Sequence, residues 1–271
     1  MKKLIFLIFV FNINVFLLGH PNYWHEITGG ISWHLMNDYN NSINKLKEDF
    51  ASLGAVPYLN QLSQGASYDF STCNKNTLYE NFVAYLRWGF IILNDNESYI
   101  NFSPTIPKKF LLLNSSFNNS YIGIGFRYYL PKSENVKYEL EKNFNIFFGV
   151  DFCLFGLFSY QYMFFEFYDI NGSYIGNLLW EAENNLFFGS HIEAGIDYWF
   201  NDWIGFIFKL GYRIASIEIK GNIKTTGIVS EYLSIQSLKQ KAEYDGFYIL
   251  FGINFSLEPF FEKKPQEKNK Q

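Results

Sequence analysis

The sequence predicts an all-β fold, a closed antiparallel up-and-down barrel of about eight strands. Aromatic residues fill 21% of the 271 positions and charged residues only 18%, so the chain must bury a large ring surface or place it in lipid. Apolar residues recur at every second position in one segment after another, which is the period of a β-strand. Beyond residue 19 no long uninterrupted apolar run follows, so membrane-spanning helices are not expected.

The N-terminal residues 1–19 read as a signal peptide. Lysines at positions 2 and 3 precede an apolar run that ends at Leu18, which is the order of a secretory signal. Two asparagines interrupt this run, and it is shorter than the roughly 20 apolar residues of a spanning helix. We therefore expect cleavage after Gly19, a barrel over residues 20–257 and a disordered polar tail over residues 258–271.

The first four expected strands are 24–35, 79–93, 98–113 and 121–130. In the first, isoleucines and a tryptophan alternate with small or polar residues. The second alternates large apolar residues with Arg87 and Gly89, and the third is interrupted by Pro104 and Pro107. The fourth ends at Pro131, because proline cannot donate a hydrogen bond to a neighbouring strand.

The last four expected strands are 143–158, 186–200, 203–220 and 246–257. Phenylalanine recurs in the first of them opposite Asp151 and Cys153, and Asn201-Asp202 is a hairpin signal between the next two. Phenylalanine and isoleucine alternate through the final strand. Most of the eight approach the 9–11 residues that a tilted strand needs to cross a bilayer, and single-chain bacterial barrels have an even strand count.

The expected connections alternate between short and long, as in membrane barrels. The short turns are 94–97, 131–142 and 201–202, and the long outer loops are 36–78, 104–120, 159–185 and 221–243. Within the first loop, residues 41–53 place Ile43, Leu46 and Phe50 at helical spacing, which predicts a short amphipathic helix. This helix could cap the barrel mouth, lie at the lipid interface or simply pack on neighbouring loops.

Residue size predicts which face of the strands points inward. The face opposite the rings carries ten glycines, which suit a crowded interior better than a solvated surface: Gly30, Gly89, Gly123, Gly125, Gly149, Gly189, Gly195, Gly205, Gly211 and Gly252. The same face carries a polar network of Glu26, Arg87, Arg127, Asp151, His191, Glu193, Asp197, Lys209 and Arg213. Its four positive and four negative charges balance, as buried charges must.

This network has two interpretations, an ion path and a salt-bridged plug. An eight-stranded barrel is just wide enough for side chains to fill it, so we favour the plug. The opposite face, with phenylalanine at every second position, matches a lipid-facing band. A soluble lipocalin-like ligand binder would need the reverse orientation, with the rings inside.

The stretch 191–213 (HIEAGIDYWFNDWIGFIFKLGYR) and the closing stretch 246–255 (GFYILFGINF) resemble the small outer-membrane β-barrel proteins. That eight-stranded group includes OmpX-like, OmpW-like and OmpA-type membrane domains. The resemblance is architectural and covers about residues 22–257. It implies a monomer in the outer membrane of a Gram-negative bacterium, with membrane lipid as its partner. Many relatives end at the last aromatic of the final strand, whereas this chain continues to Gln271.

Other classes of function find little support in the sequence. The net charge is −4 and no basic cluster follows any segment, which excludes a nucleic-acid binder. His191, Glu193 and Asp197 suggest a hydrolase, but Ser190 points to the other side of their strand, so we expect no enzyme. The remaining histidines, His20, His25 and His34, are too irregularly spaced for a metal site, and no cofactor is expected.

The two cysteines, Cys73 and Cys153, are expected to be inert thiols, although export would permit a disulfide. We therefore expect an outer-membrane protein with a structural or surface-interaction role, whose long outer loops can contact ligands outside the cell. The alternative is a narrow passive channel for small hydrophobic molecules. It is suggested by the inward positions of Phe147, Ile207 and Leu250.

Overall fold

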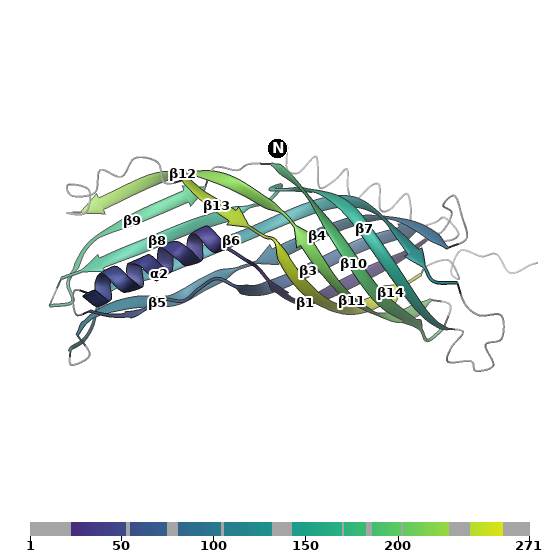
Figure 1. Ribbon diagram of the computed structural model, residues 1–271, viewed down its shortest axis with the longest axis horizontal. Helices are drawn as coiled ribbons and strands as arrows, with labels where there is room; N and C mark the ends of the chain where they lie inside the picture. The colour runs from purple at the N-terminus through teal and green to yellow at the C-terminus, as the bar shows by residue number, and fades with distance from the viewer. Residues whose placement is uncertain are drawn as a thin grey trace, which may run out of the picture.

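The computed structural model describes residues 23–52, 55–74, 81–103, 106–131, 143–169, 171–182, 186–201, 203–227 and 239–256. The predicted signal peptide and the predicted tail lie outside these residues. The described chain is elongated, with a barrel at one end and an open curved sheet carrying one helix at the other (Figure 1). Among the described residues, no helix has the length and apolar character needed to cross a membrane.

Eight strands form the barrel: β1 (Tyr23–Trp33), β3 (Gln64–Asn74), β4 (Phe82–Ile92), β6 (Ile106–Tyr129), β7 (Phe144–Phe155), β10 (Phe187–Trp199), β11 (Ile204–Ile214) and β14 (Gly246–Phe255). Each strand pairs antiparallel with the next in that order. The first and last strands also pair, with His25 opposite Phe255, so the barrel is closed. The predicted fold class is confirmed.

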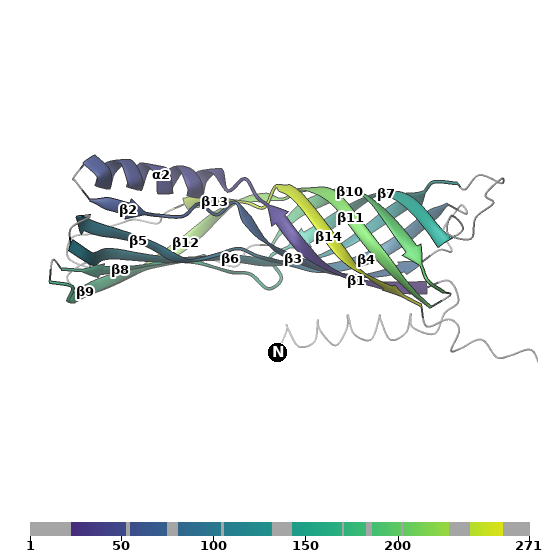
Figure 2. The same ribbon diagram turned by 90° about the horizontal axis from the view of Figure 1, so that it is seen from below.

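The barrel continues at one end into an open curved sheet, which we call the surface sheet. It consists of β2 (Val56–Tyr58), β5 (Asn94–Ser103), the first half of β6, β8 (Tyr160–Tyr168), β9 (Tyr174–Ala182), β12 (Ser216–Gly227) and β13 (Lys239–Glu243). Strand β6 belongs to both parts, because its 24 residues run from the surface sheet to the far end of the barrel (Figure 2).

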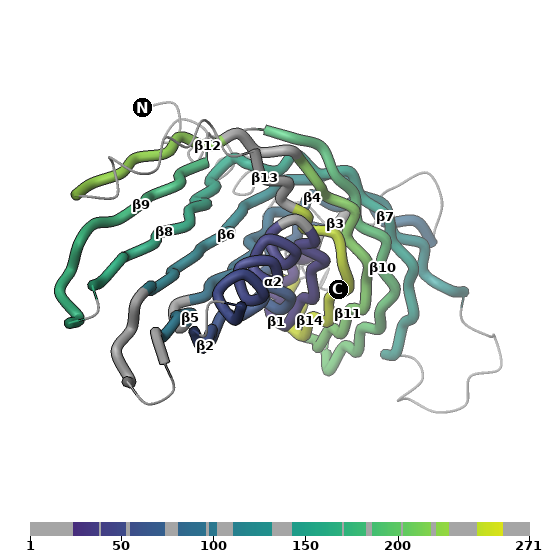
Figure 3. The backbone as a smooth tube through the Cα atoms, turned by 60° about the vertical axis from the view of Figure 1, so that its left-hand side comes forward, coloured from purple at the N-terminus to yellow at the C-terminus, as the bar shows by residue number. Residues whose placement is uncertain are grey.

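The surface sheet curves around the helix α2 (Asn37–Ser52), as Figure 3 shows. Tyr39 and Ile43 of this helix are buried in an apolar cluster that includes Phe117 and Trp180, while Leu46 packs against the cluster. The Asn37 backbone N–H donates to Glu243 Oε2 at 2.9 Å, which places a carboxylate at the positive end of the helix. The predicted helix is therefore confirmed, and it packs on neighbouring outer segments.

Several predicted strands and loops are corrected by the pairing. Residues 98–113 form no barrel strand, because they belong to β5 and the first half of β6 in the surface sheet. The eighth barrel strand is instead β3, which lies inside the predicted loop 36–78. The predicted turn 94–97 falls within β5, and the predicted loop 159–185 contains β8 and β9. The outer connections are thus largely strands, which pair with one another above the barrel.

The exterior of the barrel is apolar. Ile124, Phe152 and Phe188 are 62%, 71% and 83% exposed, whereas Arg87 and Arg127 inside the barrel are fully buried. A soluble barrel turns its rings inward and its charges toward water, so this orientation is the reverse of a soluble ligand binder. It is the orientation of a barrel surrounded by lipid, because exposed rings are stable in hydrocarbon and costly in water.

The inward glycines make room for tyrosines on neighbouring strands. Three such pairs face each other across the strand register: Gly89 with Tyr121, Gly125 with Tyr85, and Gly211 with Tyr248. A Cβ added to any of these glycines would come within 2.3–2.4 Å of the tyrosine Cζ. Each tyrosine therefore lies over a glycine, which fills the narrow interior without a collision.

Candidate functional site

The barrel interior is the site that the sequence singles out, and all nine predicted residues lie in it. Each is at most 2% exposed. They come from six barrel strands: Glu26 from β1, Arg87 from β4, Arg127 from β6, Asp151 from β7, His191, Glu193 and Asp197 from β10, and Lys209 and Arg213 from β11. The alternation of these strands directs the side chains toward one axis.

Two arginines form the centre of the network. Arg127 pairs with Glu26, its Nη2 lying 2.8 Å from Glu26 Oε2, and its Nε donates to Glu193 Oε1 at 2.9 Å. Arg87 pairs with the other oxygen of Glu193, and its Nη1 lies 2.6 Å from Asp151 Oδ2. Glu193 therefore bridges both guanidinium groups, and direct ion pairs link strands that are not neighbours in the barrel, β6 with β1 and β4 with β7 and β10.

Aromatic rings lie close to two of the arginines, Arg127 and Arg213. The Arg127 guanidinium carbon lies 4.6 Å from the centre of the Tyr85 ring and 4.5 Å from that of Phe147. Arg213 lies 5.4 Å from the rings of both Tyr121 and Tyr248. These contacts stabilise cations that have been removed from water.

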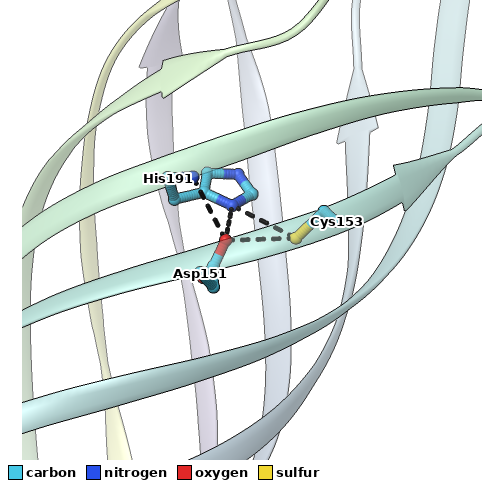
Figure 4. Close-up of side chains that lie close together, drawn as sticks. All are labelled: Asp151, Cys153 and His191. Carbon is cyan, nitrogen blue, oxygen red and sulfur yellow. Dashed lines mark hydrogen bonds and ion pairs between the residues drawn. The ribbon is translucent and has the colours of Figure 1, made fainter.

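Asp151, Cys153 and His191 form a compact cluster whose ligand atoms lie within 4.8 Å of one another (Figure 4). His191 Nδ1 lies 2.6 Å from Asp151 Oδ1, and Cys153 Sγ donates to the same oxygen at 3.1 Å. Arg213 Nε donates to His191 Nε2 at 2.8 Å. Nε2 is therefore the acceptor, so Nδ1 carries the proton and donates it to Asp151.

These roles do not fit a metal site. The imidazole nitrogen that faces Asp151 and Cys153 carries a proton, while a ligating nitrogen must offer a lone pair. The guanidinium group of Arg87 contacts Asp151, and that of Arg213 contacts His191. The positive charge of these two groups would repel a metal cation bound in the cluster. The cluster is a hydrogen-bonded part of the interior network.

Two predicted residues lie apart from the central pairs. Asp197 accepts a hydrogen bond from Asn145 Nδ2 at 2.6 Å. Lys209 Nζ lies 3.5 Å from Glu26 Oε2 and 3.8 Å from Asp69 Oδ2. Asp69 was missed by the sequence analysis, because β3 was assigned to a loop. With it, the described interior holds five carboxylates against four Lys and Arg side chains, rather than the expected four against four.

Both cysteines are free and buried. Cys73 lies on β3 and not in a loop as expected, and its Sγ donates to Glu26 Oε1 at 3.3 Å. Cys153 lies on β7 as predicted. Each thiol is thus a hydrogen-bonded member of the interior.

Aromatic side chains lie at both ends of the interior. Toward the surface sheet, Phe155 stacks on Phe187 at 5.1 Å between ring centres, and Phe187 stacks on Tyr244 at 6.2 Å. At the end with the short turns, Trp24 contacts Tyr129 at 6.5 Å and Trp199 at 6.4 Å. The charged network therefore lies between two aromatic layers. These interior layers were not predicted, because their members come from strand ends where the alternation is unreliable.

No protein-family model matches the chain, and no curated protein matches it. Among solved structures it is similar to Neisserial surface protein A, with 9% identity over 87% of this chain and 96% of that one, at a TM-score of 0.41. It is also similar to the outer membrane protease OmpT from Escherichia coli, with 10% identity over 88% and 97% of the two chains, at a TM-score of 0.40.

A third solved structure is that of the Escherichia coli outer membrane protein W, with 10% identity over 87% of this chain and 97% of that one, at a TM-score of 0.30. All three are outer-membrane proteins. At these scores the likeness carries no argument about mechanism. The membrane barrel is established here by its closed strand pairing and its apolar exterior.

Proposed function

We propose that this chain is an outer-membrane barrel with a closed lumen, which anchors the surface sheet as a platform for contacts outside the cell. The observation that carries the proposal is the set of fully buried charged side chains at the barrel axis, Arg87 and Arg127 foremost. Their direct pairs with Glu26, Glu193 and Asp151 fill the interior of an eight-stranded barrel. A solute would have to break several of these pairs to pass.

The surface sheet supports the second half of the proposal. Its outward face carries exposed tyrosines in place of the phenylalanines of the barrel, among them Tyr58 and Tyr160 at 52% and 59% exposure. Such rings offer both an apolar surface and a hydroxyl to a partner. The partners we propose are membrane lipid around the barrel and extracellular ligands at the surface sheet, with the barrel acting as a monomer.

Conductance measurements test the closed lumen. The refolded protein is inserted into planar bilayers, with a known porin as the positive control. We expect no current steps above the empty bilayer and no arabinose flux into liposomes. Stable open channels in the unmodified protein would overturn the proposed closure.

Surface exposure is tested separately on intact cells. A single cysteine introduced by Tyr160→Cys is treated with a membrane-impermeant maleimide, in a chain carrying Cys73→Ser and Cys153→Ala. We expect labelling at position 160. Labelling only after cell lysis would refute the outward placement of the surface sheet.

The second candidate is a narrow passive route for small hydrophobic molecules. It is favoured by Phe147, Ile207 and Leu250, which face inward and are fully buried. Uptake of a hydrophobic fluorophore into cells distinguishes the two functions. Uptake above that of cells lacking the protein supports the route, and equal uptake supports the closed lumen.

A further inference from the structure

One wall of the barrel holds buried polar atoms that make no hydrogen bond to any residue in the described part of the chain. They are both side-chain amide atoms of Asn254, Ser71 Oγ, Thr28 Oγ1 and Asp69 Oδ2. Asn254 and Ser71 are fully buried, and Thr28 and Asp69 are 2% and 4% exposed. Such groups are almost always satisfied by protein or by ordered water, so each of them requires a partner.

The strand register brings these groups together. Asn254 on β14 lies opposite Glu26 on β1, and Glu26 lies opposite Ser71 on β3, so the three form one row across the wall. Thr28 lies opposite Asp69 in the next inward-facing row. Because residues two apart on a strand share a face, both rows point into the lumen. We call these groups the β14–β1–β3 wall.

Lys209 on β11 reaches this wall from the neighbouring strand. Its ammonium lies 3.5 Å from Glu26 Oε2 and 3.8 Å from Asp69 Oδ2. A charge-assisted hydrogen bond is shorter, about 2.7–2.9 Å. The ammonium therefore makes one long hydrogen bond to Glu26 and none to Asp69, so its three N–H donors are not all used by the protein.

The arginines of β4 and β6 make shorter contacts. Arg87 and Arg127 contact Asp151, Glu193 and Glu26 directly, at 2.6–2.9 Å where the contacts are of ordinary length. No water is needed to join them. The direct pairs meet the wall at Asp69, whose Oδ2 lies 3.6 Å from Arg87 Nε, and most of the unpaired polar atoms in the middle of the barrel belong to the wall.

We propose that the β14–β1–β3 wall is an internal hydration site, occupied by a cluster of water molecules that connects Lys209 to Asp69, Thr28, Ser71 and Asn254. A buried water molecule typically makes about three hydrogen bonds and needs two to four polar partners. The wall supplies donors in Asn254 and Lys209 and acceptors in Asp69 and the Asn254 carbonyl. Because Lys209 already places a positive charge between the carboxylates, the ligand is neutral water and not a metal cation.

Water-edited solid-state NMR on the protein in lipid bilayers tests the proposal directly. Two inward-facing glycines serve as a matched pair. Gly252 lies opposite Thr28 on the hydrated wall, whereas Gly149 lies between Arg127 and Glu193, which pair directly. We expect magnetisation from water to reach the Gly252 backbone amide several times faster than that of Gly149. Equal rates at the two glycines, whether slow or fast, would overturn the proposal.

Substitutions at Asn254 provide a second readout. Asn254→Leu removes the amide, so we expect slower water transfer at Gly252 and a lower temperature for the gel-mobility shift on heating. Asn254→Ser keeps a hydroxyl in the wall and should preserve fast transfer. A dry, unsatisfied amide would instead be improved by leucine, so a higher shift temperature in Asn254→Leu contradicts the hydration site. Neither readout depends on conductance, so the site and the proposed closed lumen can fail independently.

Discussion

Removal of Arg127 is the sharpest test of the interior network. Arg127→Ala deletes the guanidinium that pairs with Glu26 and donates to Glu193, and all three side chains are buried. Two carboxylates then remain in the interior with fewer partners, which include Lys209 at 3.5 Å from Glu26 and Arg87 beside Glu193. Breaking a buried pair by removing one member typically costs about 3–5 kcal/mol, so we expect a loss of that size in the free energy of unfolding.

Urea unfolding in phospholipid vesicles, followed by tryptophan fluorescence, measures this loss. The matched control is Lys224→Ala, which removes an exposed pair with Glu181 at 3.2 Å in the surface sheet. We expect the control to cost less than about 1 kcal/mol.

A compensating pair of substitutions separates charge from packing. Arg127→Met combined with Glu26→Gln leaves no unpaired charge at this position, so it should recover about 2 kcal/mol relative to the sum of the single changes. If Arg127→Ala costs no more than Lys224→Ala, the ion pairs do not hold the interior together and the reasoning is refuted.

Three further predictions follow from the fold. Gly89→Ala would place a Cβ within 2.3 Å of the Tyr121 ring and should cost about 1–3 kcal/mol in the same unfolding assay; an unchanged midpoint would contradict the glycine–tyrosine packing. Phe208→Cys should react with a lipid-phase maleimide and Lys209→Cys should not, since Lys209 is fully buried in the interior; labelling of both would refute the assigned faces. His34 lies just beyond β1. Burial and the charge of Arg213 lower its pKa to about 3, although the hydrogen bond to the Tyr244 carbonyl acts in the opposite direction and raises the pKa. The unfolded chain thus binds the extra proton first, so His34 should contribute about 2 kcal/mol to the loss of stability from pH 7 to pH 5, and His34→Gln should reduce the loss measured by urea unfolding by that amount.

The sequence predicted the closed barrel and its orientation because both depend on local alternation. Phe148, Val150 and Phe152 point outward while Gly149 and Asp151 point inward, and this pattern needs no knowledge of distant contacts. The interior placement of the charged residues could be read from the same phase. The partners of each charged residue could not be predicted from the sequence. The pairing of Arg87 with Glu193, for example, spans 106 residues and depends on strand order and barrel size.

Strand β3 escaped prediction because its inward face is small or polar and its outward face carries only two large residues. Its inward residues include Ser67, Asp69 and Ser71, and Tyr68 and Phe70 are its only large outward residues. The surface sheet was missed for the opposite reason. In β8 both faces carry aromatic residues, since one face packs toward α2 and the other is lined with tyrosines, so no alternation of polarity remains.

The continuity of β6 has a practical consequence for engineering the cell-exposed half of the molecule. Segments that look like independent loops in the sequence are hydrogen-bonded neighbours, and deleting one would strip β6 or β9 of a partner along its length. A strand edge with unpaired backbone N–H and C=O groups can pair with another chain and cause aggregation. Epitope tags or passenger domains should therefore be inserted at hairpin tips such as Asn171-Gly172, where the ladder already ends.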